Sequence, residues 1–409
     1  MMWKLLGGVA LVLLVIVSAV IGSDLLRKQS EWDRIASPYS FNIIRWEFEN
    51  LFDKWEYKLR EVFDKSELSE AESVQLVKDY LSLAQEITSL EARINREKAE
   101  GLGSEKEIAD WEAELAALKT ERDRLENQVE EIIEGQISGV LADEGLSTTL
   151  KLGGEVELLF PPVDFEFEER PNLLIVSTRH KIEFVDTVLL RPGMSLEEMV
   201  EIEGAVEALD YSGLVAPLGG VATYPSIVSR MPSLQNLFSK IAHEWLHHYF
   251  FFRPLGQRYW SNYEMTTINE TAADIAGNEI GPMVYERYYA GGEEMVPLAE
   301  EQEPVFDFGG EMREIRTAVD DYLLEGKIGE AERYMEEKRE FLEANGYYIR
   351  KLNQAYFAFH GTYADTPTSV SPIGDQLRKL REQSSSLGDF INTVSGVSSY
   401  EELLEMIGE

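Results

Sequence analysis

The stretch "HEWLHHYF", which begins at His243, concentrates histidine in a chain that has little of it. The 409 residues include five histidines, and three of them lie in this stretch. Its surroundings have the apolar spacing of a buried helix, and helical positions four apart share a face. His243 and His247 therefore point the same way, at the separation that two imidazoles need to hold one zinc ion. Glu244 is rotated away from this pair, so it can reach a water beside the metal and act as general base.

A catalytic zinc site needs a third protein ligand, and "INETAADIAGNE" supplies a candidate. Glu270 lies 23 residues after His247, which leaves room for a turn and a second helix. Glu270 and Asp274 share a face of that helix, so one carboxylate can ligate zinc while the other accepts the N–H of a ligating histidine. Small residues at 272, 273, 276 and 277 allow the two helices to approach closely. Two histidines and one carboxylate leave net positive charge on the site, which lowers the pKa of bound water.

The paired motifs H-E-x-x-H and N-E-x-x-x-D resemble those of the gluzincin metallopeptidases, the clan of thermolysin-like proteases and many zinc aminopeptidases. The resemblance covers about 60 residues, Gly219 to Glu279. It implies a zincin-like domain with Glu244 as the catalytic glutamate and Asp274 orienting a ligand histidine, His243. The zinc ligands that it implies are His243, His247 and Glu270.

The same resemblance implies two further parts of the site. A strand around Val221 to Tyr224 would lie beside an extended substrate. A histidine or tyrosine would stabilise the oxyanion, and "FAFHGTYAD" offers His360 and Tyr363 for this role. A buried, satisfied His360 is an equally good interpretation. Of the other histidines, His248 points off the metal face and is expected to be structural, and His180 is expected at the surface.

Two heptad seams precede the globular part. They run from Leu76 to Ile94 and from Ile108 to Ile132, with "AEGLGSEKE" between them. Ser104 and Glu107 have the capping-box spacing that starts a helix. The pattern predicts an antiparallel coiled-coil hairpin at residues 65–137, either a separable spacer or dimerisation stalk, or a partner-binding arm.

An uncharged run, Leu5 to Ile21, predicts a transmembrane signal anchor at residues 1–23, followed by a juxtamembrane helix at 24–64. The alternative is a cleaved signal peptide ending at Ala19. Either interpretation places the protein at the cell membrane, single-pass if the anchor is retained, with the catalytic domain outside the cytoplasm.

The composition of the chain argues against nucleic-acid binding and against chemistry that depends on cysteine. Thirty-eight basic and 75 acidic residues give a net charge of −37, which repels nucleic acid. There is no cysteine, which excludes disulfides, thiolate metal sites and cysteine nucleophiles.

The expected architecture is an α+β zincin-like metallopeptidase domain at residues 145–409, with strands first and helices after, behind the anchor and the hairpin. The expected function is a membrane-anchored, zinc-dependent peptidase that acts on peptides or proteins, with Zn²⁺ as cofactor. The alternative is a metal-binding or inactive peptidase-like scaffold whose hairpin binds partner proteins. The hairpin also offers a surface for self-association.

Overall fold

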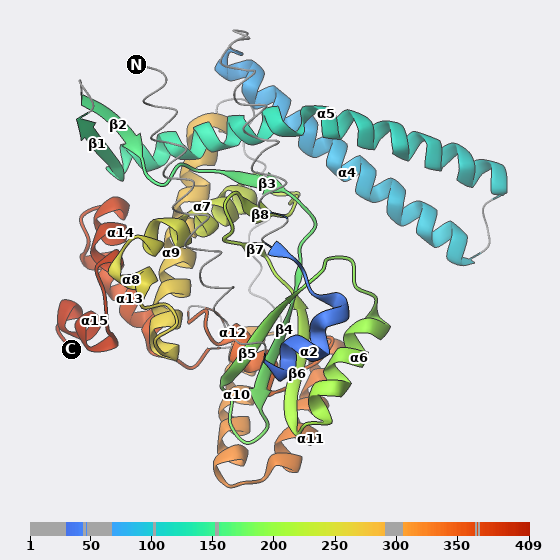
Figure 1. Ribbon diagram of the computed structural model, residues 1–409, viewed down its shortest axis with the longest axis vertical. Helices are drawn as coiled ribbons and strands as arrows, with labels where there is room; N and C mark the ends of the chain where they lie inside the picture. Colours follow the sequence, from blue (N-terminus) through green and yellow to red (C-terminus); the bar gives the residue numbers. More distant parts are fainter. Residues whose placement is uncertain are drawn as a thin grey trace.

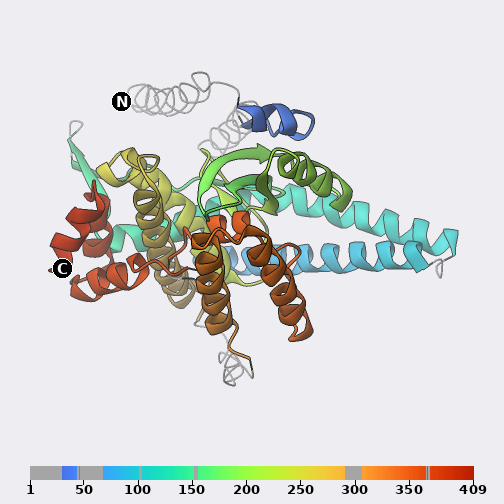
Figure 2. The same cartoon turned by 90° about the horizontal axis from the view of Figure 1, so that it is seen from below.

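The computed structural model describes residues 30–43, 46, 68–100, 104–151, 155–290, 306–364, 366 and 369–409, and these are mainly helical. The helices are α2 (Glu31–Ala36), the 3₁₀ turn η1 (Ser37–Tyr39), α4 (Glu70–Glu100), α5 (Glu105–Asp143), α6 (Leu196–Glu207), α7 (Leu234–Phe251), α8 (Pro254–Gln257), α9 (Tyr263–Tyr289), α10 (Phe308–Leu324), α11 (Ile328–Ala344), α12 (Gln354–His360), α13 (Ile373–Gln383), α14 (Leu387–Ser395) and α15 (Tyr400–Ile407). The strands are β1 (Ser147–Lys151), β2 (Glu155–Leu159), β3 (Phe165–Phe167), β4 (Asn172–Thr178), β5 (Phe184–Leu190), β6 (Tyr211–Pro217), β7 (Gly220–Val221) and β8 (Ser226–Val228). Figures 1 and 2 show a helical hairpin, α4 and α5, projecting from a body that contains the other elements.

The hairpin forms as its heptads and its cap predict. Ser104 begins α5 with a capping box, in which its side chain accepts from the amide of Glu107 and the Glu107 carboxylate accepts from the amide of Ser104. Seam residues such as Ile87 and Ile94 are buried between the two helices. The outer half is also linked by exposed ion pairs, including Lys119 to Glu91 at 2.5 Å.

The base of the hairpin belongs to the main hydrophobic core. Val77 and Tyr80 of α4 and Ile133 of α5 are completely buried, in one cluster with Phe238 and Trp245 of α7. The boundary expected between residues 137 and 145 therefore falls inside a continuous core. Sequence periodicity located the seam, but it could not show that the seam continues into the body.

Helix α5 also provides hydrogen-bond acceptors for backbone amides on the outer edge of strand β3. The carboxylate of Glu130 accepts from the amide of Phe167 at 2.7 Å, and that of Glu134 accepts from the amide of Phe165 at 3.1 Å. Both glutamates are buried, and among the described strands β3 is paired only on its β8 side. The hairpin thus contributes polar as well as apolar contacts to the body.

Two three-stranded sheets and one two-stranded sheet complete the described β structure. In the antiparallel sheet β5-β4-β6, Leu174 and Val176 face a cluster with α2 and α6, while Ile175 faces α12 on the other side. In the sheet β3-β8-β7, β3 runs parallel to β8 and β7 runs antiparallel to it. This order places Gly220 of β7 at the sheet edge, against α7.

Helices α7 and α9 form the most extensive helix pair of the body. Small residues on α9, the predicted Gly277 and also Gly281, explain their close approach. A Cβ on Gly277 would lie 2.8 Å from the carbonyl oxygen of Ser239, and one on Gly281 would lie 2.1 Å from its Oγ. The backbones therefore approach at a distance that larger side chains would prevent, and this brings the two motif-bearing helices together.

The prediction of an α+β fold led by strands needs correction. The described chain is mainly helical, and its sheets have only two or three short strands. Strands such as β4 and β5 do precede the two motif-bearing helices. The order of elements could not indicate how few strands would pair, because pairing depends on contacts distant in sequence.

The prediction of a membrane anchor is also corrected. Residues 1–23, and most of the juxtamembrane helix expected at 24–64, lie outside the described residues. Of the helices that the structure does describe, none combines the length and the apolar composition needed to cross a bilayer. The long helices α4, α5 and α9 carry charged residues along their length because they have solvent-facing sides. The described residues thus contain no spanning helix of the kind that the predicted single-pass, cell-membrane arrangement needs.

Candidate metal centre

Helix α7 supplies the two histidines. Ser233 caps its start, and its apolar face, including Phe238, Ile241 and Trp245, is buried in the main core. The indole N–H of Trp245 donates to the carbonyl of Pro161 at 2.9 Å, which ties the middle of the helix to the segment before β3. The face bearing the histidines is thereby turned toward α9.

Helix α9 supplies the carboxylates. Asn262 caps it, with its Oδ1 accepting from the amide of Met265 at 2.8 Å. The short helix α8 and the turn after it reverse the chain, so Glu270 returns to the level of the histidines. The chain between the two motifs therefore turns back and enters a second helix, for which the spacing of the motifs leaves room.

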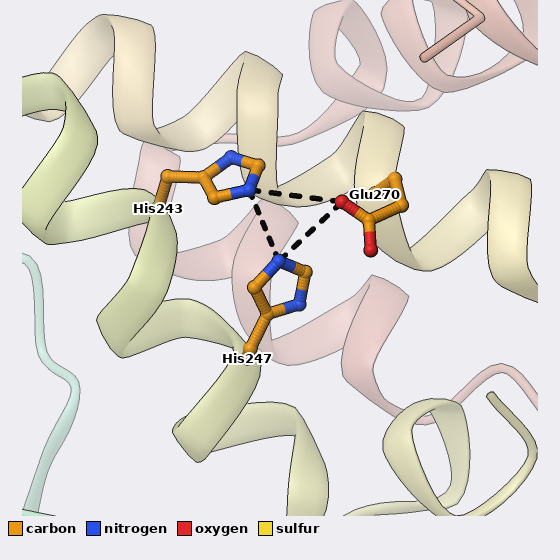
Figure 3. A group of neighbouring side chains, drawn as sticks. All are labelled: His243, His247 and Glu270. Atoms are coloured by element: carbon orange, nitrogen blue, oxygen red, sulfur yellow. Dashed lines mark hydrogen bonds and ion pairs between the residues drawn. The ribbon is translucent and has the colours of Figure 1, made fainter. Parts of the chain in front are cut away.

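Three ligand atoms converge on one point (Figure 3). The Nε2 atoms of His243 and His247 are 3.0 Å apart, and Oε2 of Glu270 lies 3.7 Å and 3.5 Å from them. Three ligands at roughly 2.0–2.1 Å from a tetrahedral ion would be about 3.3–3.4 Å from one another. These three residues can therefore hold a metal ion with little rearrangement.

A second polar group lies behind each of the three residues. Oδ1 of Asn269 accepts from Nδ1 of His247 at 2.8 Å, which leaves Nε2 of His247 for the metal, as outer partners of histidine ligands usually ensure. Oδ1 of Asp274 lies 2.8 Å from Nδ1 of His243, without the geometry of a hydrogen bond. The hydroxyl of Tyr259 donates to Oε1 of Glu270, the oxygen not aimed at the histidines.

Two of these supporting residues were not predicted. Asn269 had a signal in the sequence, since it directly precedes Glu270 and is placed by the helix turn toward His247. Tyr259 had none, because its position depends on how the chain reverses after α8.

Charge is arranged unevenly across the group. Burial lowers the pKa of His243 to about 3, so this imidazole is neutral. Burial also disfavours protonation of His247, but the charge and hydrogen bond of Glu270 outweigh it and raise the pKa of His247 to about 9. Burial alone would raise the pKa of Glu270, yet His247 lowers it well below its usual range. The charges of His247 and Glu270 therefore stabilise each other in this buried group.

Glu244 lies on the side of this group that faces β7. It is 3% exposed, and its Oε1 lies 3.0 Å from Nζ of Lys240, one turn earlier on α7. Burial disfavours the charge on Lys240, but Glu244 outweighs burial and raises the pKa of Lys240, which keeps it an ammonium. Strand β7, which includes Val221 of the segment expected beside a substrate, covers this pair from above.

The two residues offered for the oxyanion are placed differently. The ring centroid of Tyr363 lies 6.4 Å from that of His243, and burial together with the charge of Glu270 raises the pKa of Tyr363 well above its usual value. The ring of His360 packs on Tyr356, at 4.3 Å between centroids, and burial lowers its pKa to about 4. Tyr363 is therefore the one seen beside a ligand histidine.

The remaining histidines lie apart from the metal ligands. The ring of His248 packs against Tyr224, at 5.4 Å between centroids, and burial lowers its pKa to about 4. His180 lies at the surface, in the turn between β4 and β5.

Comparisons of the chain with protein-family models, curated proteins and solved structures found no match. The chemistry of the site must therefore be argued from its residues and their geometry.

Proposed function

We propose that this protein is a zinc-dependent peptidase of the gluzincin type. The observation that carries the proposal is the convergence of two imidazole nitrogens and one carboxylate oxygen, together with a buried glutamate that directly follows the first histidine in the chain. Two nitrogen ligands and one oxygen ligand, with a fourth position left for water, are typical of catalytic zinc. A structural zinc site would usually be closed by a fourth protein ligand.

The residues have distinct roles in this proposal. A zinc ion held by His243, His247 and Glu270 would polarise the carbonyl of the substrate. It would also lower the pKa of a bound water, which could then act as a nucleophile near neutral pH. Glu244 accepts the proton of the attacking water and passes it to the leaving amine. The hydroxyl of Tyr363, whose ring lies beside that of His243, is the donor suited to the oxygen that gains charge.

Hydrolysis of a mixed peptide library by the zinc-loaded chain tests the proposal. Glu244→Gln should keep the fold and the zinc but reduce turnover by about 10²–10⁴-fold. His180→Ala, at the surface in the turn between β4 and β5, is the control and should leave turnover unchanged. Undiminished cleavage by Glu244→Gln would rule out its role as base. Zinc binding without cleavage by the wild type would instead favour a metal-binding scaffold.

A further inference from the structure

The Lys240–Glu244 pair on α7 is an unusual neighbour for a metal centre. Its side chains are only 20% and 4% exposed, and Nζ lies 3.0 Å from Oε1. Removing two charges from water is costly, and a buried ion pair is weak evidence for stability. The three metal ligands need no cation at this position, so the pair calls for another explanation.

Two glycines of the covering segment fit closely over this pair. A Cβ on Gly220 would lie 2.4 Å from Oε1 of Glu244, and one on Gly219 would lie 3.0 Å from Cε of Lys240. Neither glycine has a positive φ, so any residue could adopt its backbone conformation. A side chain at either position would therefore displace the end of the Lys240 or Glu244 side chain from its present place.

We propose that Lys240 and Gly220 are positioning residues that fix the carboxylate of Glu244 for the reaction. The ammonium holds Oε1 beneath β7, and the second carboxylate oxygen is thereby presented to the attacking water. A glutamate side chain with three rotatable bonds would otherwise spread its carboxylate over several positions. Both residues act through Glu244 and touch no reacting atom. This inference rests on the proposed peptidase and deepens it.

Kinetics of two variants test the inference from different directions. Lys240→Met removes the charge and keeps the length, whereas Gly220→Ala keeps the charge and displaces the carboxylate. Each should lower kcat by about 10–100-fold, because a displacement of about 1 Å can cost 10²-fold. KM should stay within about twofold, and zinc content should not change, because substrate and metal binding are not affected.

Matched controls separate this effect from general damage. Lys181→Met removes an exposed lysine, and Gly135→Ala adds a methyl group where no atom lies within 4 Å. Both should behave as the wild type. Unchanged kcat in Lys240→Met and Gly220→Ala would overturn the inference, as would a loss of zinc in parallel with kcat.

A second readout uses the metal-free chain and needs no activity. Thermal unfolding is measured for the wild type, Lys240→Met, Glu244→Gln and the double variant. In the otherwise wild-type chain, Lys240→Met should lower Tm by about 2 °C or more, because it leaves the buried carboxylate of Glu244 without its ammonium partner. In a chain that already carries Glu244→Gln, the same substitution should lower Tm by much less. Additive shifts in Tm would overturn the inference that Lys240 holds the carboxylate of Glu244. Strong coupling between the Lys240 and Glu244 substitutions, in a chain that cleaves no peptide, would refute the proposed peptidase. It would still uphold the inference that Lys240 holds the carboxylate of Glu244.

Discussion

Asn269 fixes the orientation of His247, because its Oδ1 accepts a 2.8 Å hydrogen bond from Nδ1 of that ring. The other ring nitrogen is thereby directed at His243 and Glu270. Since Asn269 and Glu270 are adjacent in sequence, one turn of α9 supplies both a ligand and the support of another ligand.

Loss of this support should weaken metal binding without unfolding the chain. Asn269→Ala is expected to reduce zinc affinity by about 10–100-fold, the usual effect of removing an outer partner of a ligand histidine. Asn269→Asp keeps an acceptor oxygen and should retain more of the affinity. Competition with a chromophoric chelator measures both constants. Wild-type affinity in Asn269→Ala would show that the hydrogen bond does not contribute.

Close packing of α7 on α9 should make Gly281 intolerant of any side chain. Gly281→Ala places a Cβ 2.1 Å from Oγ of Ser239 and 2.5 Å from the carbonyl oxygen of Gln235. Overpacking of this kind should lower the free energy of unfolding by about 1–3 kcal/mol. Gly204→Ala in α6, with no atom within 4 Å, is the matched control and should be neutral or stabilising. Equal stability of the two variants, measured by denaturant titration, would contradict the packing described here.

An ion pair should couple the hairpin to the body energetically. The guanidinium of Arg230 donates hydrogen bonds to three groups. They are the hydroxyl of Tyr80 and the carbonyl oxygen of Phe167, each at 3.0 Å, and the carboxylate of Glu126. Arg230→Met and Glu126→Gln should each destabilise the protein, and a double-mutant cycle should give a coupling energy of about 1–2 kcal/mol. This value is smaller than for a fully buried pair, because both side chains retain about a fifth of their exposure. A coupling energy near zero would show that this ion pair does not help to join the hairpin and the body.

The two halves of the hairpin should differ in their importance for folding. Glu91 and Lys119 face each other across the seam, so residues 91–119 can be replaced by a short glycine-containing turn. This shortened chain should stay soluble and bind zinc. A chain that starts at Ala142 should not, because it exposes the core around Phe165 and removes the two carboxylates that accept from amides of β3. Solubility, circular dichroism and zinc content compare the two; a folded, zinc-binding chain from Ala142 would restore the separable catalytic domain that the sequence suggested.

Local signals predicted the parts of the structure that depend on local physics. The periodicity around His243 predicts its helix, and the Ser104–Glu107 spacing predicts the cap that the structure contains. Helix geometry also predicts that His243 and His247 share a face, which the distance between their Nε2 atoms bears out.

Features that depend on chain reversal or on distant packing were not predictable in this way. Tyr259 reaches Glu270 only because α8 and the following turn fold back. Gly220 meets Glu244 because β7 pairs with β8 and both strands pack against α7. The sheets are smaller than the strand-rich sequence suggests, since pairing partners are chosen by tertiary contacts.

The zinc content of the purified chain tests the central claim most directly. After zinc loading and dialysis, the wild type should retain about one equivalent per chain by elemental analysis, and His247→Ala should retain close to none, because two protein ligands cannot replace three. His180→Ala should match the wild type. Equal zinc in the wild type and in His247→Ala, or none in either, would contradict the assignment of His243, His247 and Glu270 as a zinc centre.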